Sequence, residues 1–263
     1  MQTKNLIYED ATIFYRITGE GKPVVLVHGF GEDGEVWEKQ IEVLQQNFLL
    51  IIPDLPGSGH STYLQNADID TYAAIMKAIL DKESIENCTM VGHSMGGYTT
   101  LAFAEKYPAY LNAFVLFHSS AFADNDEKKE TRKKAIEFIQ NNGAHNFLKT
   151  STPGLFISVE KSNNYINELL EKGKNFTAAA LIQYYEAMIK RPDRTTILKS
   201  FDKPVLFIIG EHDKAIPLES SLQQCHFPAI SHVHILKNSA HMGMYEETAK
   251  ANGILQDFLK IIV

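Results

Sequence analysis

The sequence of 263 residues predicts an α/β fold, in which helices flank a mostly parallel central sheet and one all-helical segment is inserted. Two observations support this prediction. Short β-branched runs alternate with helical patterns along most of the chain, as in parallel sheets covered on both faces. Between about residues 122 and 195 the alternation stops, and the pattern is helical almost throughout. We therefore expect one α/β core of residues 1–121 and 196–263, with a helical insertion at 122–195.

The first half of the core should begin with strands. Residues 5–9 and 11–17 form two β patterns, the second of which alternates between its two faces. The runs 23–28 and 48–53 are apolar almost throughout, as in strands that are buried on both faces. The other elements expected before residue 122 are helices at 34–46, 69–82 and 95–107 and strands at 89–91 and 113–117.

The insertion and the second half of the core follow. Helical patterns within the insertion cover 126–141, 143–149, 162–173 and 176–190, with a break at 152–154 and one candidate strand at 155–159. The charge-rich run 128–134 is typical of a solvated helix face. The alternation then resumes with strands at 204–209 and 232–236 and helices near 218–224 and 246–260.

Composition and charge exclude several classes of function. The chain is 44% hydrophobic and 22% charged, as an ordinary globular protein is. Its net charge of −7 gives no basic footprint for nucleic acid. No apolar run is long enough to span a bilayer, and the N-terminus lacks a signal peptide, so a cytoplasmic location is expected. The two cysteines, Cys88 and Cys225, do not suggest a disulfide framework.

The most specific motif follows a predicted buried strand and opens a predicted helix. It reads Gly92-His93-Ser94-Met95-Gly96 and fits the G-x-S-x-G nucleophile elbow. A serine hydroxyl is a weak nucleophile, and it must be presented, free of neighbouring bulk, to a base and a carbonyl carbon. An abrupt turn from strand to helix presents it in this way, and the flanking glycines leave room in the crowded turn. We predict that Ser94 is a catalytic nucleophile.

A serine nucleophile needs a base, and the base needs a carboxylate that orients it. All three side chains should lie at the carboxyl ends of strands, because the loops there share one edge of the sheet. Asp213 follows the strand at 204–209, and His241 follows the strand at 232–236. We predict that Asp213 is the acid and His241 the base, with Glu211 as an alternative acid.

Several motifs occur together with this order of residues. They are His28-Gly29-Phe30-Gly31, the turn at 54–61, the elbow, Gly210-Glu211-His212-Asp213 and Ser239-Ala240-His241. In this combination the whole chain resembles the α/β-hydrolase superfamily, in its serine-nucleophile, esterase-like branch with a helical cap. The resemblance implies that the backbone N–H groups of Phe30 and Met95 form an oxyanion hole. It also implies that residues 122–195 form the cap.

The predicted triad and the resemblance favour a serine hydrolase that cleaves a small to medium apolar carboxylic ester through an acyl-enzyme. This chemistry needs no cofactor. The expected partner is a small-molecule ester, without nucleic acid or membrane, and the sequence does not indicate an oligomeric state. Apolar side chains that would line an acyl pocket are Phe122, Phe156, Tyr184, Met188 and Met242, beside Phe30 and Met95.

Two other functions would use the same fold. A carbon–carbon bond hydrolase or an enol-lactone hydrolase would keep the triad, but the insertion shows no arginine cluster to clamp a dicarboxylate, since Arg191 and Arg194 are its only close pair. A ligand-sensing module would keep the triad to bind or slowly turn over a signal. We expect no metal site, because His232 and His234 share one face of a strand without a third ligand nearby.

Overall fold

Eight strands form one sheet in the computed structural model, which describes residues 1–262. The strand order is β1-β2-β4-β3-β5-β6-β7-β8. The pairs β1–β2 and β2–β4 are antiparallel, and the other pairs are parallel. The strands are β1 (Gln2–Tyr8), β2 (Ala11–Thr18), β3 (Lys22–Val27), β4 (Phe48–Pro53), β5 (Cys88–His93), β6 (Leu111–Phe117), β7 (Val205–Gly210) and β8 (Ser231–Leu236).

Helices separate the strands of the core and fill the insertion. Those of the core are α1 (Glu38–Leu44), α2 (Ile69–Lys82), α3 (Met95–Lys106), α8 (Thr195–Ser200), α9 (Leu218–Gln224), α10 (Gly243–Glu246) and α11 (Thr248–Ile261). Those of the insertion are α4 (Asp126–Asn142), α5 (Ala144–Ser151), α6 (Asn163–Gly173) and α7 (Ala178–Lys190). Single 3-10 turns lie at Gly34–Trp37, Pro108–Tyr110 and Thr152–Leu155. The predicted fold class, a mostly parallel sheet flanked by helices, is confirmed.

Strand β3 shows why its apolar run is continuous. Side chains of a strand point alternately to its two faces. Val25 and Val27 are buried in the core on the α2 and α3 face, whereas Val24 and Leu26 are buried in the core on the opposite face. Both faces of the sheet therefore carry a hydrophobic core, and a central strand needs apolar residues at successive positions.

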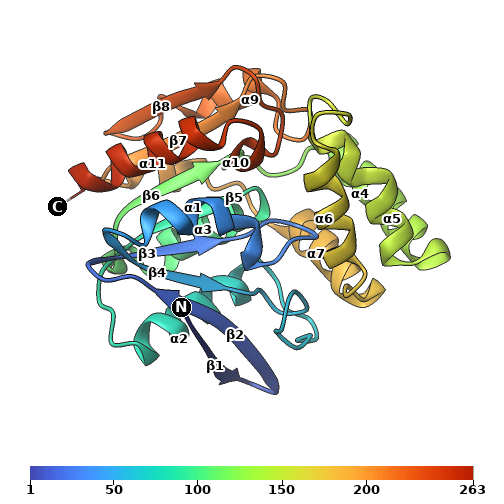
Figure 1. The fold of residues 1–263 in the computed structure, drawn as a ribbon, viewed down its shortest axis with the longest axis horizontal. Coiled ribbons are helices and arrows are strands. Elements are labelled where there is room, and N and C mark those ends of the chain that lie inside the picture. Colours follow the sequence, from blue (N-terminus) through green and yellow to red (C-terminus); the bar gives the residue numbers. More distant parts are fainter. Residues whose placement is uncertain (263) are drawn as a thin grey trace.

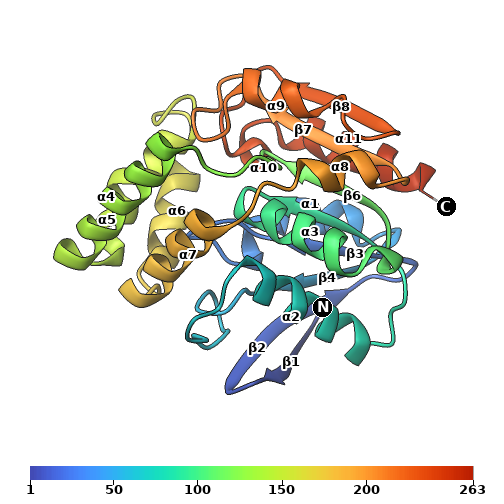
Figure 2. The ribbon, with the colours of Figure 1, turned by 180° about the vertical axis from the view of Figure 1, so that it is seen from behind.

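Helices cover both faces of the sheet. Helices α1 and α11 lie on the face toward the viewer in Figure 1, where they contact each other. Helices α2, α3 and α8 lie on the opposite face, which Figure 2 shows from behind. The helices of the insertion, α4 to α7, stand together beyond one end of the strands rather than on either face (Figure 1).

The insertion lacks the candidate strand at 155–159, so this prediction was wrong. A 3-10 turn at Thr152–Leu155 occupies its start, and the residues after it form turns. Ile157 and Val159 are 46% and 51% exposed. The apolar run therefore does not pair with the sheet, because no strand edge lies beside it in the insertion.

The parallel strands bring the predicted site residues to one edge. Ser94 directly follows β5, Asp213 lies just beyond β7, and His241 lies beyond β8. In addition, β4 and β5 lie on opposite sides of β3, so the strand order reverses direction there. In open α/β sheets, ligands bind beyond the carboxyl ends of the strands at such a reversal. The fold thus places the candidate site at this edge.

Candidate active site

The turn at Ser94 is strained and tightly packed. Ser94 adopts φ 50° and ψ −115°, a backbone conformation that residues with a side chain rarely adopt. A Cβ at Gly92 would lie 2.4 Å from the carbonyl oxygen of Gly96, and a Cβ at Gly96 would lie 2.3 Å from that of Val27. Glycine is therefore required at both positions, because the end of β5, the start of α3 and β3 approach one another there.

The side chain of Ser94 meets that of His241. The Nε2 atom of His241 lies 2.9 Å from Oγ of Ser94, and its Nδ1 atom lies 2.7 Å from Oδ2 of Asp213. The three side chains follow three different strands. Ser94 lies 119 positions before Asp213, and Asp213 lies 28 positions before His241. A base that is oriented by a carboxylate and placed beside a hydroxyl can deprotonate that hydroxyl.

The carboxylate of Asp213 is held by the backbone. Its Oδ1 atom accepts hydrogen bonds from the N–H groups of Ala215 and Ile216 at 2.8 and 2.9 Å. Burial alone would raise the pKa of Asp213, but the adjacent His241 and His118 hold it well below its ordinary range. Asp213 is therefore ionised at neutral pH. The alternative acid, Glu211, is exposed and makes no hydrogen bond or ion pair with His241.

His118 is a further neighbour of Asp213, and no sequence motif indicated it. Its Nδ1 atom accepts the N–H of Gly210 at 3.0 Å and lies 3.5 Å from Oδ2 of Asp213. Burial lowers the pKa of His118 to about 4, so the ring is neutral at neutral pH. Asp213 therefore faces one neutral histidine that packs beside it and one, His241, that it orients.

A second buried pair lies under the site. The Nδ1 atom of His93 lies 3.0 Å from Oε2 of Glu32, and its Nε2 atom lies 3.0 Å from the backbone oxygen of His241. Both ring nitrogens thus face acceptors, an arrangement that favours the protonated ring, in which both nitrogens donate. Burial alone would lower the pKa of His93, but Glu32 raises it above its ordinary value. The pair connects the elbow to the loop that carries His241.

Glu32 also holds the loop after β3. Its Oε2 atom accepts the N–H of Gly29 at 2.7 Å. On the other side of this loop, Nε2 of His28 accepts the N–H of Leu55 at 2.9 Å, which ties the end of β3 to the turn after β4. Between these ties, the N–H of Phe30 has no hydrogen-bond partner within residues 1–262, and the same holds for Met95. Both amides are free to donate to a ligand.

A cavity of about 150 Å³ opens at Ser94 and His241. Of the apolar residues predicted to line it, Phe30 and Met188 do so. The other lining residues, which the sequence did not indicate, come from the helical insertion, α3 and the loops after β3 and β7. They are Tyr98, Lys128, Arg132, Leu155, Tyr185, Ala215 and Ile216, together with Glu32.

Several predicted pocket residues lie elsewhere. Tyr184 is fully buried, and its hydroxyl donates to the carbonyl of Pro56 at 2.8 Å. Its neighbour Tyr185 lines the cavity instead, because successive residues of a helix point about 100° apart. Phe156 packs near Tyr245 in the core on the α1 and α11 face of the sheet, with ring centroids 6.5 Å apart. Met242 lines a separate space of about 90 Å³ behind Phe30 and Leu155.

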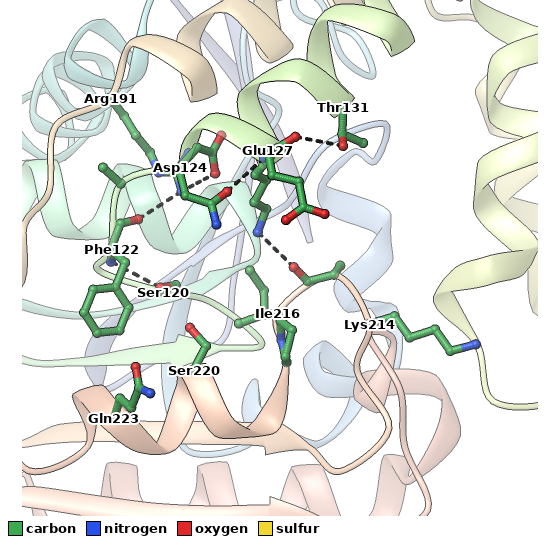
Figure 3. A pocket seen from close by; sticks show the side chains of 15 residues that line it. Ser120, Phe122, Asp124, Glu127, Thr131, Arg191, Lys214, Ile216, Ser220 and Gln223 are labelled. Atoms are coloured by element: carbon green, nitrogen blue, oxygen red, sulfur yellow. Dashed lines mark hydrogen bonds and ion pairs between the residues drawn. The ribbon is translucent and has the colours of Figure 1, made fainter.

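Phe122 lines a larger cavity of about 610 Å³ next to the first. This cavity lies between the start of α4 and the start of α9, and Figure 3 shows Asp124 and Glu127 on one side and Ile216 and Ser220 on the other. The two cavities share Lys128, Ala215 and Ile216 as lining residues. Phe122 is therefore beside the candidate site rather than in the cavity at Ser94.

The described part of the chain shows two further features. Within residues 1–262, no group of three or more histidine, cysteine, aspartate or glutamate side chains is arranged to hold a metal ion. No helix in these residues combines the length and apolar character that crossing a membrane requires.

Comparisons with known proteins place the chain in a family. Residues 22–248 match the family described as the alpha/beta hydrolase fold. A non-heme chloroperoxidase of Kitasatospora aureofaciens is 27% identical over 80% of this chain and 80% of its own length. The 2-hydroxy-6-oxononadienedioate/2-hydroxy-6-oxononatrienedioate hydrolase of Paraburkholderia phymatum is 24% identical over 94% of this chain and 90% of its own.

Solved structures agree with this result. A thermophilic esterase from Thermogutta terrifontis, solved with malate bound, superposes with a TM-score of 0.93 and 25% sequence identity. The match covers 100% of this chain and 99% of that structure. The chain therefore belongs to the α/β hydrolase fold family, and this membership supports a hydrolase activity.

The buried pair of Glu32 and His93 should stabilise the fold. Replacing Glu32 with Gln leaves the buried ring of His93 without a carboxylate partner. The free energy of unfolding should therefore fall by about 3–5 kcal/mol at pH 6. Because the pKa of Glu32 is lowered in the folded protein, its ionisation stabilises the fold above about pH 4.3. Because the pKa of His93 is raised, its protonation stabilises the fold fully below about pH 6.5. The measurement is urea unfolding of both proteins across this range.

The difference in the free energy of unfolding between wild type and Glu32→Gln should become smaller as the pH rises through the raised pKa of His93. The wild-type pair then loses its positive charge. Glu35→Gln is the control, since the side chain of Glu35 is 47% exposed in its pairs with Arg16 and Lys172. It should change stability by less than about 1 kcal/mol. Equal stabilities of Glu32→Gln and wild type at pH 6 would show that the pair is not charged.

Proposed function

We propose that the chain is a serine hydrolase that cleaves a carboxylic ester through an acyl-enzyme. The observation that carries the proposal is the continuous hydrogen-bonded series from Ser94 through His241 to Asp213 at the carboxyl edge of the sheet. The strained backbone of Ser94 and the two free amides beside it support the same conclusion. The family includes hydrolases, and the relatives named above include an esterase and a hydrolase of a dicarboxylate.

The first half of the proposed reaction forms the acyl-enzyme. Nε2 of His241 accepts the proton of the Ser94 hydroxyl while Oγ attacks the ester carbonyl carbon, and the carbonyl oxygen becomes an oxyanion. The N–H groups of Phe30 and Met95 donate to this oxyanion, and each such donor typically contributes about 10²–10³ in rate. Protonated His241 then gives the proton to the leaving alcohol, while ionised Asp213 stabilises the imidazolium.

The second half releases the acid. His241, neutral again, accepts a proton from a water molecule that attacks the acyl carbon. It then gives this proton to Oγ of Ser94 as the ester bond to Ser94 breaks and the acid leaves. Asp213 keeps the same ring orientation in both halves through its bond to Nδ1. We propose that residues 122–195 act as a cap over this chemistry, because α4, α7 and the turn at Thr152–Leu155 contribute walls of the cavity at Ser94.

A carbon–carbon bond or enol-lactone hydrolase remains the second candidate. The sequence of the insertion shows no cluster of arginines, which speaks against this function. In the structure, however, Arg132 and Arg191 both reach the carboxylate of Asp124, so two arginines distant in sequence do lie together. Arg194 is not part of this group, because it pairs with Asp70 and Glu105.

Labelling tests the nucleophile. A fluorophosphonate should modify wild-type protein at Ser94, because the reagent reacts with activated serines. The Ser94→Ala variant should not be labelled, and Ser220→Ala, whose serine lines the neighbouring cavity, should be labelled like the wild type. Mass spectrometry of the labelled peptide makes the measurement. An unlabelled wild type that is correctly folded would overturn the serine hydrolase proposal.

Substitution of the acid tests its identity. Asp213→Asn should leave the fold intact and lower kcat by about 10³–10⁴, because an amide holds the wrong tautomer of His241. Glu211→Gln, two positions away and exposed, should retain nearly full activity. Steady-state hydrolysis of p-nitrophenyl butyrate compares the two variants. If Glu211→Gln loses the activity and Asp213→Asn keeps it, the acid is misassigned.

The cavity volume predicts the acyl length. A space of about 150 Å³ holds a molecule of the size of benzene, so acyl groups of about six carbons or fewer should fit. Across p-nitrophenyl esters from acetate to decanoate, kcat/KM should be highest within that range and at least tenfold lower for decanoate. A flat and weak profile would speak against an esterase and favour the carbon–carbon hydrolase.

A further inference from the structure

The cavity at Ser94 has an apolar side and a cationic side. Phe30, Leu155 and Met188 line it with apolar surface, whereas Lys128 and Arg132 line it from α4. The two cations are four positions apart, so they lie on the same face of this helix. The run 128–134 was predicted to form a solvated face, and this holds for Lys133 and Lys134, which are exposed. Lys128 and Arg132 instead face the site.

The positive charges on this side outnumber the negative ones. The carboxylate of Asp124 has no exposed surface and is shared by two arginines: Nε of Arg132 lies 2.6 Å from Oδ2, and Nη2 of Arg191 lies 3.0 Å from Oδ1. Lys128 has no carboxylate within 4.0 Å among residues 1–262, and its Nζ atom donates to the carbonyl of Ala215 at 2.9 Å. Asp124 thus pairs with two of the three cations, and Lys128 has no carboxylate of its own.

Other acidic residues nearby do not change this balance. Glu32 lines the same cavity, but its Oε2 atom is paired with Nδ1 of His93 at 3.0 Å. Glu127 lines the neighbouring cavity, where it is exposed to solvent, and Lys214 on the same cavity is exposed as well. Solvent screens exposed charges strongly. The cations around Asp124 are therefore the dominant charges at this end of the site.

The electrostatic effect of these cations is seen at Tyr98. Its ring lies under the guanidinium of Arg191, 3.8 Å from the ring centroid, and it lines the cavity at Ser94. Burial alone would raise the pKa of Tyr98, but Arg191, Lys128 and Arg132 lower it below its ordinary value. A buried tyrosine with a lowered pKa indicates that this end of the cavity favours a negative charge.

Hydrogen-bond donors remain free at the same place. Arg132 uses Nε and Nη2 on Asp124, so Nη1 has no hydrogen-bond partner in residues 1–262. A guanidinium edge and an ammonium group together suit a carboxylate, because both can donate charge-assisted hydrogen bonds to it. Uncompensated cations at a mostly buried wall are costly, and an anionic ligand would remove that cost.

We propose that Lys128 and Arg132 bind a carboxylate carried by the substrate, so that the natural substrate is a short ester or lactone with a carboxylate at the far end of its acyl group. This inference rests on the proposed function and narrows it, because the acyl chain between the two ends would lie against Phe30, Leu155 and Met188. The small volume at Ser94 limits that chain to a few carbons.

Two esters of nearly the same shape test the proposal. Monomethyl glutarate carries the carboxylate, and methyl glutaramate carries an uncharged amide in its place. Wild-type kcat/KM should be about ten to a hundred times higher for monomethyl glutarate, as expected of charge-assisted hydrogen bonds. In Lys128→Met and in Arg132→Gln, the ratio of the two kcat/KM values should fall toward one. Release of methanol measures both reactions.

Lys134→Met is the matched control, because Lys134 is an exposed cation on the same helix outside the cavity. It should keep the wild-type ratio. A wild-type ratio near one, or the same ratio in Lys128→Met as in Lys134→Met, would overturn the carboxylate proposal. Lys128→Met keeps the Arg132–Asp124 pair, so its result stands even where Arg132→Gln fails to fold.

A binding measurement separates this proposal from the proposed function. Titration calorimetry should detect binding of monomethyl glutarate to the Ser94→Ala variant. Adding the Lys128→Met substitution should weaken this binding at least tenfold. If both esters resist hydrolysis by the wild type but this binding pattern holds, the catalytic proposal fails and the carboxylate site stands. If methyl glutaramate and monomethyl glutarate are hydrolysed equally and bind equally, the serine hydrolase stands and the carboxylate site fails.

Discussion

The close approach of β5, α3 and β3 at the elbow is the constraint on which the rest of the site depends. It forces Ser94 into a left-handed backbone conformation and leaves no room for a Cβ at Gly92 or Gly96. This strain is sustained by the packing on both sides of the sheet, where strands buried on two faces are held by separate cores. The hydroxyl is thereby directed toward His241 rather than into the helix that follows it.

Buried electrostatic ties position the loops around that turn. Asp213 is fixed by two backbone N–H groups and in turn holds Nδ1 of His241. From below, the ring of His93 donates to the backbone oxygen of His241 and pairs with Glu32, which also holds Gly29. The same buried carboxylate therefore links the loop after β3, the turn at Ser94 and the loop that carries His241. Such a network is rigid because each desolvated charge depends on its partner.

The helical insertion adds what the core alone does not have. The core supplies Ser94, His241 and the amides at the sheet edge, whereas α4 and α7 supply the walls that decide which molecules fit. One wall is apolar and the other is cationic, so the two ends of the cavity differ in polarity. Fold membership by itself would not reveal this polarity, because related folds carry different side chains at the same place.

The sequence by itself determined the fold class and the strand ends at which Ser94, Asp213 and His241 lie. Those features follow from local patterns: β-branched runs, turn residues and the glycines of the elbow. Only the tertiary structure decided that Tyr185 rather than Tyr184 faces the cavity, since this depends on how α7 is rotated against the core. It also decided that Arg132 and Arg191, 59 positions apart by their numbers, share Asp124. Contacts between distant segments depend on packing that no local pattern encodes.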